Sequence, residues 1–136
     1  MNFFKMSIFS TYPIYIKISR NEIEITDLKN ATTVRKTAST VFSGRRNVVA
    51  DFVETLNLID ELLKSLNLKG KIISPSLNVL IQQMEGFEGG LSDMEHLALN
   101  DLASISGAKY VVVMADKTIL SEDEALRKLK DRNKNV

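Results

Sequence analysis

The chain has 136 residues, no cysteine and a formal net charge of +1, with 44% hydrophobic and 26% charged residues. This length suits one domain with a continuous core, and the composition is that of a globular protein rather than a disordered one. The small net charge gives no general reason to expect nucleic acid as a partner, and the lack of cysteine excludes disulfides and thiolate chemistry. No stretch has the length of a membrane-spanning helix, and the N-terminus lacks a secretory pattern, so we expect a cytoplasmic protein.

Residues 1–10 (MNFFKMSIFS) concentrate apolar side chains around a single lysine. As a helix, this segment would be a short amphipathic anchor at a membrane surface, which would place the protein at the inner face of the cell membrane. The alternative is a tail packed on the domain or a loosely ordered start, which the small apolar area and single cation of the segment favour. The candidates for membrane contact are Phe3, Phe4, Met6, Ile8 and Phe9.

Alternating apolar and polar residues follow Pro13, at 15–19 and again at 22–26. This period predicts a β-hairpin with one buried and one solvated face. Asn21, between the two segments, tolerates the positive φ that a tight turn needs. A turn at 28–30 then leads to a third strand within 32–42, whose alternation is weaker.

Apolar residues spaced by three and four predict a helix over 51–66, and the adjacent aliphatic residues of 77–84 predict a central strand. A second helix is expected to begin with a capping box from Ser92 to Glu95 and to end before Gly107. Its expected buried face comprises Met94, Leu97, Ala98, Leu102 and Ile105. Met84, Met94 and Met114 are interpreted as core filler.

Residues 109–114 form an apolar, β-branched run that predicts another buried strand. A last short helix is expected from Ser121 to about Lys130, followed by a flexible tail over 131–136. The element order is three strands, a helix, a strand, a helix, a strand and a helix. It predicts one α/β domain over 13–130, with a five-stranded mixed sheet in the order 3-2-1-4-5 and helices packed on it. Residues 119–130 are expected to cover part of the sheet.

Several residues invite a catalytic interpretation that their surroundings do not favour. The glycines of 86–90 precede a helix, where phosphate can bind. They match neither the Walker A motif nor the three-glycine spacing of the Rossmann motif, and they lie among acidic residues. His96 has no nucleophile placed beside it by any motif. Glu24, Asp27 and Asp51 are the carboxylates that a two-metal nuclease cluster would use, although Asp51 fits a helix start better. Arg45 and Arg46 are interpreted as a solvated loop.

The element order resembles the first subdomain of the actin and hexokinase superfamily, which is related to the ribonuclease H fold. Two segments are similar to MreB, the bacterial actin that guides rod shape. One is Gly44 followed by 48–55 (VVADFVET), which opens a helix. The other runs from Met94 to 106–112 (SGAKYVV), where a helix ends in glycine, alanine and a basic residue before an apolar strand. The similarity covers about residues 1–116.

The departures from that family bear on function. In actin-like ATPases the first hairpin carries an aspartate and a glycine that hold nucleotide phosphate and magnesium. The resemblance places Lys17 at the aspartate position and Ser19 at the glycine position. A lysine there replaces an oxygen directed at magnesium by a repelling cation. The resemblance therefore implies that ATP binding is lost, and we assign no catalytic, cofactor-binding or metal-binding residue.

Two functions from different classes remain open at this point. The first is a non-catalytic actin-like module that binds a protein partner or itself, with a role near the cytoskeleton and cell shape, and without a small-molecule substrate or nucleic acid. The alternative is a small metal-dependent phosphate-handling enzyme or nuclease on the ribonuclease H-like fold.

Overall fold

The computed structural model of the protein describes residues 11–19, 21–37, 52–70, 74–85, 92–114 and 116–134. The expectations for residues 1–10, for Asp51 and for the glycines of 86–90 fall outside these ranges. The elements are, in chain order, β1 (Tyr12–Ser19), β2 (Glu22–Asp27), β3 (Thr32–Thr37), α2 (Phe52–Ser65), β4 (Leu77–Gln83), α3 (Asp93–Ile105), β5 (Ala108–Met114) and α4 (Glu122–Lys134).

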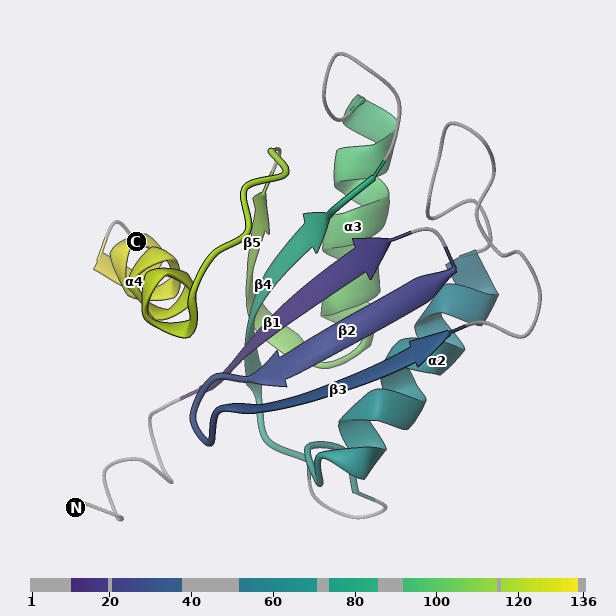
Figure 1. Ribbon diagram of the computed structural model, residues 1–136, viewed down its shortest axis with the longest axis horizontal. Helices are drawn as coiled ribbons and strands as arrows, with labels where there is room; N and C mark the ends of the chain where they lie inside the picture. The colour runs from purple at the N-terminus through teal and green to yellow at the C-terminus, as the bar shows by residue number, and fades with distance from the viewer. Residues whose placement is uncertain are drawn as a thin grey trace.

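The strands form a single five-stranded sheet in the order β3-β2-β1-β4-β5, which confirms the predicted topology (Figure 1). The pairs β1–β2 and β2–β3 are antiparallel, as expected of strands joined by short turns. The pairs β1–β4 and β4–β5 are parallel, each joined through a helical connection. β1 is therefore the central strand, where the two kinds of pairing meet.

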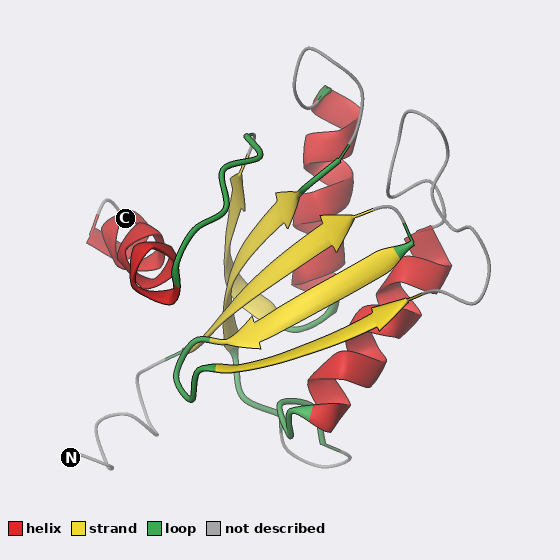
Figure 2. Ribbon diagram, viewed as in Figure 1, coloured by secondary structure: helices red, strands yellow, loops and turns green. Residues whose placement is uncertain are grey.

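Helices cover both faces of the sheet (Figure 2). α2 and α3 pack on one face, which we call the inner face, against a continuous aliphatic core that includes Ile16, Ile25 and Ile81. α4 packs on the opposite, outer face over a smaller cluster that includes Tyr15 and Leu80. The predicted packing of the last helix onto the sheet is thus confirmed. β4 is buried along its whole length because it lies between the two helical layers.

The turns adopt the backbone conformations that their residues favour. Asn21 has a φ of 64° between β1 and β2, as predicted for this hairpin. Gly107 has a φ of 120° directly after α3, a conformation that a side chain would make unfavourable. Its carbonyl accepts a hydrogen bond from Leu77 N (3.1 Å), so the end of α3 is joined directly to the start of β4.

The largest differences from the predicted element boundaries are at the start of β1 and the end of α4. β1 begins at Tyr12, because Tyr12 N donates to Ser76 O (2.8 Å) and Pro13 O accepts from Leu28 N (3.1 Å). A proline at the start of a strand is compatible with pairing, because it lacks only the N–H donor and its carbonyl can still accept a hydrogen bond. α4 continues to Lys134 and so extends four residues beyond the expected end at Lys130.

The expected buried face of α3 is wrong in part. Its buried residues are Glu95, Leu99, Leu102 and Ala103. Met94, Leu97 and Ile105 are instead exposed, by 74%, 58% and 59%. The physical reason is the capping box: Glu95 must turn toward Ser92 N, and its carboxylate also accepts from Gln83 of β4. That contact rotates the helix so that Met94 points to solvent, and Met94 is not core filler.

Candidate functional site: a polar groove beside the last helix

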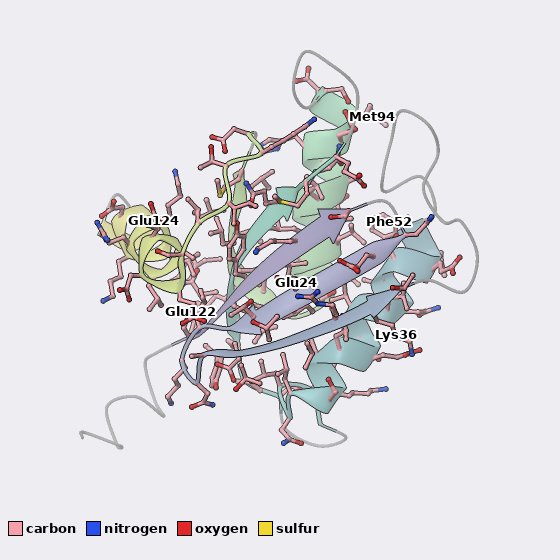
Figure 3. The ribbon with its side chains drawn as sticks, viewed as in Figure 1. Glu24, Lys36, Phe52, Met94, Glu122 and Glu124 are labelled. Carbon is pink, nitrogen blue, oxygen red and sulfur yellow. The ribbon has the colours of Figure 1, made fainter. Side chains whose placement is uncertain are left out.

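A groove of about 440 Å³ runs along the outer face of the sheet beside the start of α4. Its floor is made by side chains of β1, β2 and β3, and its wall by the chain that leads into α4. Figure 3 shows Glu24 on the sheet and Glu122 at the start of the helix. The residues that line it are Tyr15, Lys17, Glu24, Thr26, Thr33, Leu120, Ser121, Glu122 and Asp123.

Three charged side chains on neighbouring strands form a continuous ion-pair network on the outer face, and two of them, Lys17 and Glu24, line the groove floor. Lys17 lies opposite Glu24 across β1 and β2, and Glu24 lies opposite Arg35 across β2 and β3. Lys17 Nζ lies 3.3 Å from Glu24 Oε1, and an Arg35 nitrogen lies 2.9 Å from Glu24 Oε2. Both oxygens of the carboxylate therefore face a cation, which disfavours a metal ion at this position.

A buried hydrogen-bond network centred on Tyr15 and Gln82 positions the wall of the groove. The Tyr15 hydroxyl donates to Gln82 Oε1, and Gln82 Nε2 donates to the carbonyls of Asp116 (2.9 Å) and Thr118 (2.7 Å). The chain between β5 and α4 is thereby held against the sheet. Burial raises the pKa of Tyr15, and nearby carboxylates, Asp116 first, raise it further, so the hydroxyl remains a donor at neutral pH.

The start of α4 is built by local hydrogen bonds. Glu124 N donates to Ser121 Oγ (3.2 Å) and Ser121 N donates to Glu124 Oε1 (2.9 Å), which together form a capping box. These hydrogen bonds from Ser121 lower the pKa of Glu124. The groove has a mixed character, with the ion pair of Lys17 and Glu24 on its floor and the carboxylates of Glu122 and Asp123 on its wall.

Of the carboxylates in the nuclease interpretation, Glu24 and Asp27 are not brought together, and Asp51 lies outside the described residues. Glu24 lies on the outer face, whereas Asp27, three residues later, is on the other side of the strand, because successive side chains of a strand alternate. Asp27 is 2% exposed and accepts from the Tyr12 hydroxyl (2.8 Å) and from Lys29 N and Asn30 N (3.0 Å each). Burial, followed by the bond to Asp27, raises the pKa of Tyr12 to about 12. Asp27 therefore stabilises a turn.

A second polar cluster lies at the end of β4, where the strand meets the start of α3. Gln83 Nε2 donates to Glu95 Oε2 (2.9 Å), and Ser92 N donates to Glu95 Oε1 (3.0 Å). This confirms the predicted capping box and leaves the carboxylate of Glu95 internally satisfied. His96 is exposed on the same helix. The cluster closes the end of the inner core.

Sequence reasoning missed Arg35, Gln82 and Gln83 as members of these networks. The signal for the two glutamines was available, since a pair of amides ends an otherwise aliphatic strand (LNVLIQQ), and buried amides need partners. Arg35 could not have been found, because its contact with Glu24 depends on the register between β2 and β3.

No protein-family model matches the chain, and no curated protein matches it either. Within the described ranges, no group of three or more metal-ligating side chains has the geometry to hold an ion. None of the helices described is both long and apolar enough to cross a membrane.

Proposed function

We propose that this protein is a non-catalytic, actin-like interaction domain that binds another protein of the cytoskeleton or cell envelope. In this proposal it acts in the cytoplasm, at the inner face of the membrane, with residues 1–10 as the membrane contact and a role related to cell shape. The α/β fold with strand order 3-2-1-4-5 is the architecture that the resemblance to MreB implies. Fold alone does not define function, so the proposal depends on surface residues.

The observation that carries the proposal is an exposed apolar stripe on α3. Met94, Leu97 and Ile105 lie three and eight residues apart, spacings that place them on one side of a helix, and all three are more than half exposed. Asp93 and Asp101 are exposed on the same helix, which carries no lysine or arginine. Exposed apolar side chains in such a group mark interaction sites, and the acidic residues favour a partner with basic and apolar side chains.

The ion pairs of the groove support a function without ATP. The position that the resemblance assigns to a magnesium-directed carboxylate is Lys17, and its ammonium is engaged by Glu24. Glu24 is in turn engaged by Arg35. A triphosphate bridged by magnesium would have to break these pairs and would find no carboxylate at position 17 to direct the ion.

Adding magnesium and ATP is therefore expected to leave the melting temperature unchanged. A ligand at one hundred times its Kd stabilises a folded protein by about 2.7 kcal/mol, which is several degrees for a chain of this size. Thermal unfolding followed with and without millimolar Mg²⁺ and ATP tests this. A rise in melting temperature that grows with nucleotide concentration would contradict the proposal, and Mg²⁺- or Mn²⁺-dependent hydrolysis of nucleic acid would favour the enzymatic alternative.

Placing two lysines in the α3 stripe, as Leu97→Lys with Ile105→Lys, is expected to remove partner binding without unfolding the chain. The reason is that both side chains are exposed, so lysine costs little stability, whereas it removes apolar contact and repels a basic partner. Affinity capture from host extract, quantified for each variant, measures the effect.

The matched control adds the same charge to the same helix away from the stripe, as His96→Lys with Asn100→Lys. Proteins captured by the wild type and by this control, but lost with the stripe variant, are the partners expected. Equal capture by all three chains would show that the stripe is not the binding surface.

A further inference from the structure

The two edge strands of the sheet are protected to very different degrees. β3, at one edge, has the sequence TTVRKT, with two cations beside a single aliphatic residue. β5 lies at the other edge (Figure 1) and has the sequence AKYVVVM, with one cation as its second residue. Charges on an edge strand are a common defence against pairing with a second chain. Among the described strands, none pairs with the outer edge of β5.

The backbone of β5 presents free hydrogen-bonding groups at this edge. Met84 N, directly after β4, donates to Ile18 O of β1. Because the N–H and C=O groups of successive strand residues point in opposite directions, those of the even-numbered residues of β4 point to β1 and those of the odd-numbered residues point to β5. Val79 and Ile81 lie opposite Val111 and Val113. In a parallel ladder, a residue forms its hydrogen bonds with the residues before and after its partner. Val79 and Ile81 therefore bond to residues 110, 112 and 114 of β5. The N–H and C=O groups of Val111 and Val113 therefore point outward.

We propose that two copies of this chain pair through these edges, with their β5 strands antiparallel and Val111 opposite Val111. The two sheets then become one continuous sheet. This register matches all seven residues of the strand, and the two copies of Val111 exchange two hydrogen bonds at its centre. The outward groups of Val113 extend the pairing toward Lys109 of the other copy, which lies at the register shift between β4 and β5. A two-fold axis through the Val111 pair closes the assembly at two copies, because it uses both available edges.

Charge and side-chain character favour a second copy over an unrelated peptide. Lys109 is the second residue of β5, and Asp116 lies just beyond the end of the strand. Antiparallel pairing brings Lys109 of each strand toward the segment of the other that contains Asp116. Tyr110 and Val112 lie opposite each other across the pair, and their half-buried side chains gain an apolar neighbour. The pairing specifies a partner and a surface for the proposed interaction function, and it is separate from the α3 stripe.

A disulfide test measures the register directly, because the chain contains no cysteine. In Val111→Cys the two thiols face each other with their Cα atoms about 5.5 Å apart, within the range of a disulfide. In Val113→Cys the equivalent atoms are about 13 Å apart, since each residue lies four positions from its copy. Mild oxidation is expected to crosslink the first variant roughly tenfold faster or more. Val34→Cys, on the β3 edge, is expected to remain monomeric.

A charge test measures the assembly itself. Wild-type protein is expected to sediment with twice the 15.3 kDa chain mass and to dissociate on dilution. Val111→Lys is expected to sediment as a monomer, because it places a charge at the centre of the paired edges. Val34→Lys is the matched control: Val34 is also a half-buried valine on an edge strand, packed on the same core, and its lysine variant is expected to remain a dimer. Thermal melts of both variants show that each remains folded.

Other outcomes would overturn the proposal in distinguishable ways. A wild-type chain that is monomeric at all concentrations, or faster crosslinking of Val113→Cys, would exclude the pairing as stated. If Val34→Lys dissociated the dimer and Val111→Lys did not, the interface would lie at the β3 edge instead. A monomer that loses a captured protein on Val111→Lys would show that the edge takes an extended peptide instead. Partner capture through the α3 stripe would survive each of these results, so a failure here leaves the interaction function to be tested separately.

Discussion

Replacing Gln82 by leucine is expected to lower the free energy of unfolding by about 2–4 kcal/mol. The two side chains are similar in size, so the change removes hydrogen bonds rather than volume. It leaves the Tyr15 hydroxyl, on a residue 2% exposed, without its acceptor, and leaves the carbonyls of Asp116 and Thr118 without their donor. Urea unfolding followed by circular dichroism measures the difference. A loss of this size is a large share of a domain's total stability.

Two further variants separate the contribution of the Tyr15–Gln82 hydrogen bond from that of the other hydrogen bonds of Gln82. Tyr15→Phe removes only the hydroxyl and is expected to cost about 1–2 kcal/mol, because Gln82 Oε1 then lacks a donor. The double variant Tyr15→Phe with Gln82→Leu is expected to lose less than the sum of the two, since residues that share a hydrogen bond are coupled. Strict additivity would show that the Tyr15–Gln82 bond contributes nothing to stability.

Glu95→Ala is expected to cost about 3 kcal/mol, whereas Met94→Ala, one residue away, is expected to change stability by less than about 0.5 kcal/mol. Glu95 is 2% exposed and satisfies both Gln83 Nε2 and Ser92 N, so its removal leaves two donors without an acceptor. Met94 is 74% exposed and has little to lose. Thermal or urea unfolding of the two alanine variants compares them directly.

This pair of variants tests which way α3 faces. The hydrophobic pattern alone predicts the opposite order, with methionine in the core and glutamate in solvent. A larger loss for Met94→Ala than for Glu95→Ala would therefore show that the helix is rotated from the orientation described above.

The topology could be predicted from the sequence because its determinants are local. Alternation gave the β1–β2 hairpin, the aliphatic run of 77–84 gave a central strand, and Gly107 marked the step from helix to strand. Chain connectivity and the handedness of crossovers then left one strand order. The face of α3 could not be predicted in this way, because a buried acceptor for Gln83 outweighed the burial of three apolar side chains.

The candidate site was predictable only in part, for a related reason. Lys17 could be identified as a cation where the resemblance implies a carboxylate, but its contact with Glu24 required the register between β1 and β2. Arg35 required a second register, and the groove required the position of α4. Each of these is a long-range relationship between residues that look unremarkable in their own segments.

The two helical layers do not hold the sheet equally. In the described part of the chain, sixteen buried residues form the core of the inner face, whereas six form the cluster beneath α4. Local opening costs less where fewer apolar side chains must be exposed. We therefore expect detachment of α4 to cost less free energy than opening of the inner helical layer. Such an opening would expose Leu80, Val112 and Met114 to water, and the capacity of this protein to avoid aggregation would depend on how quickly the helix packs again.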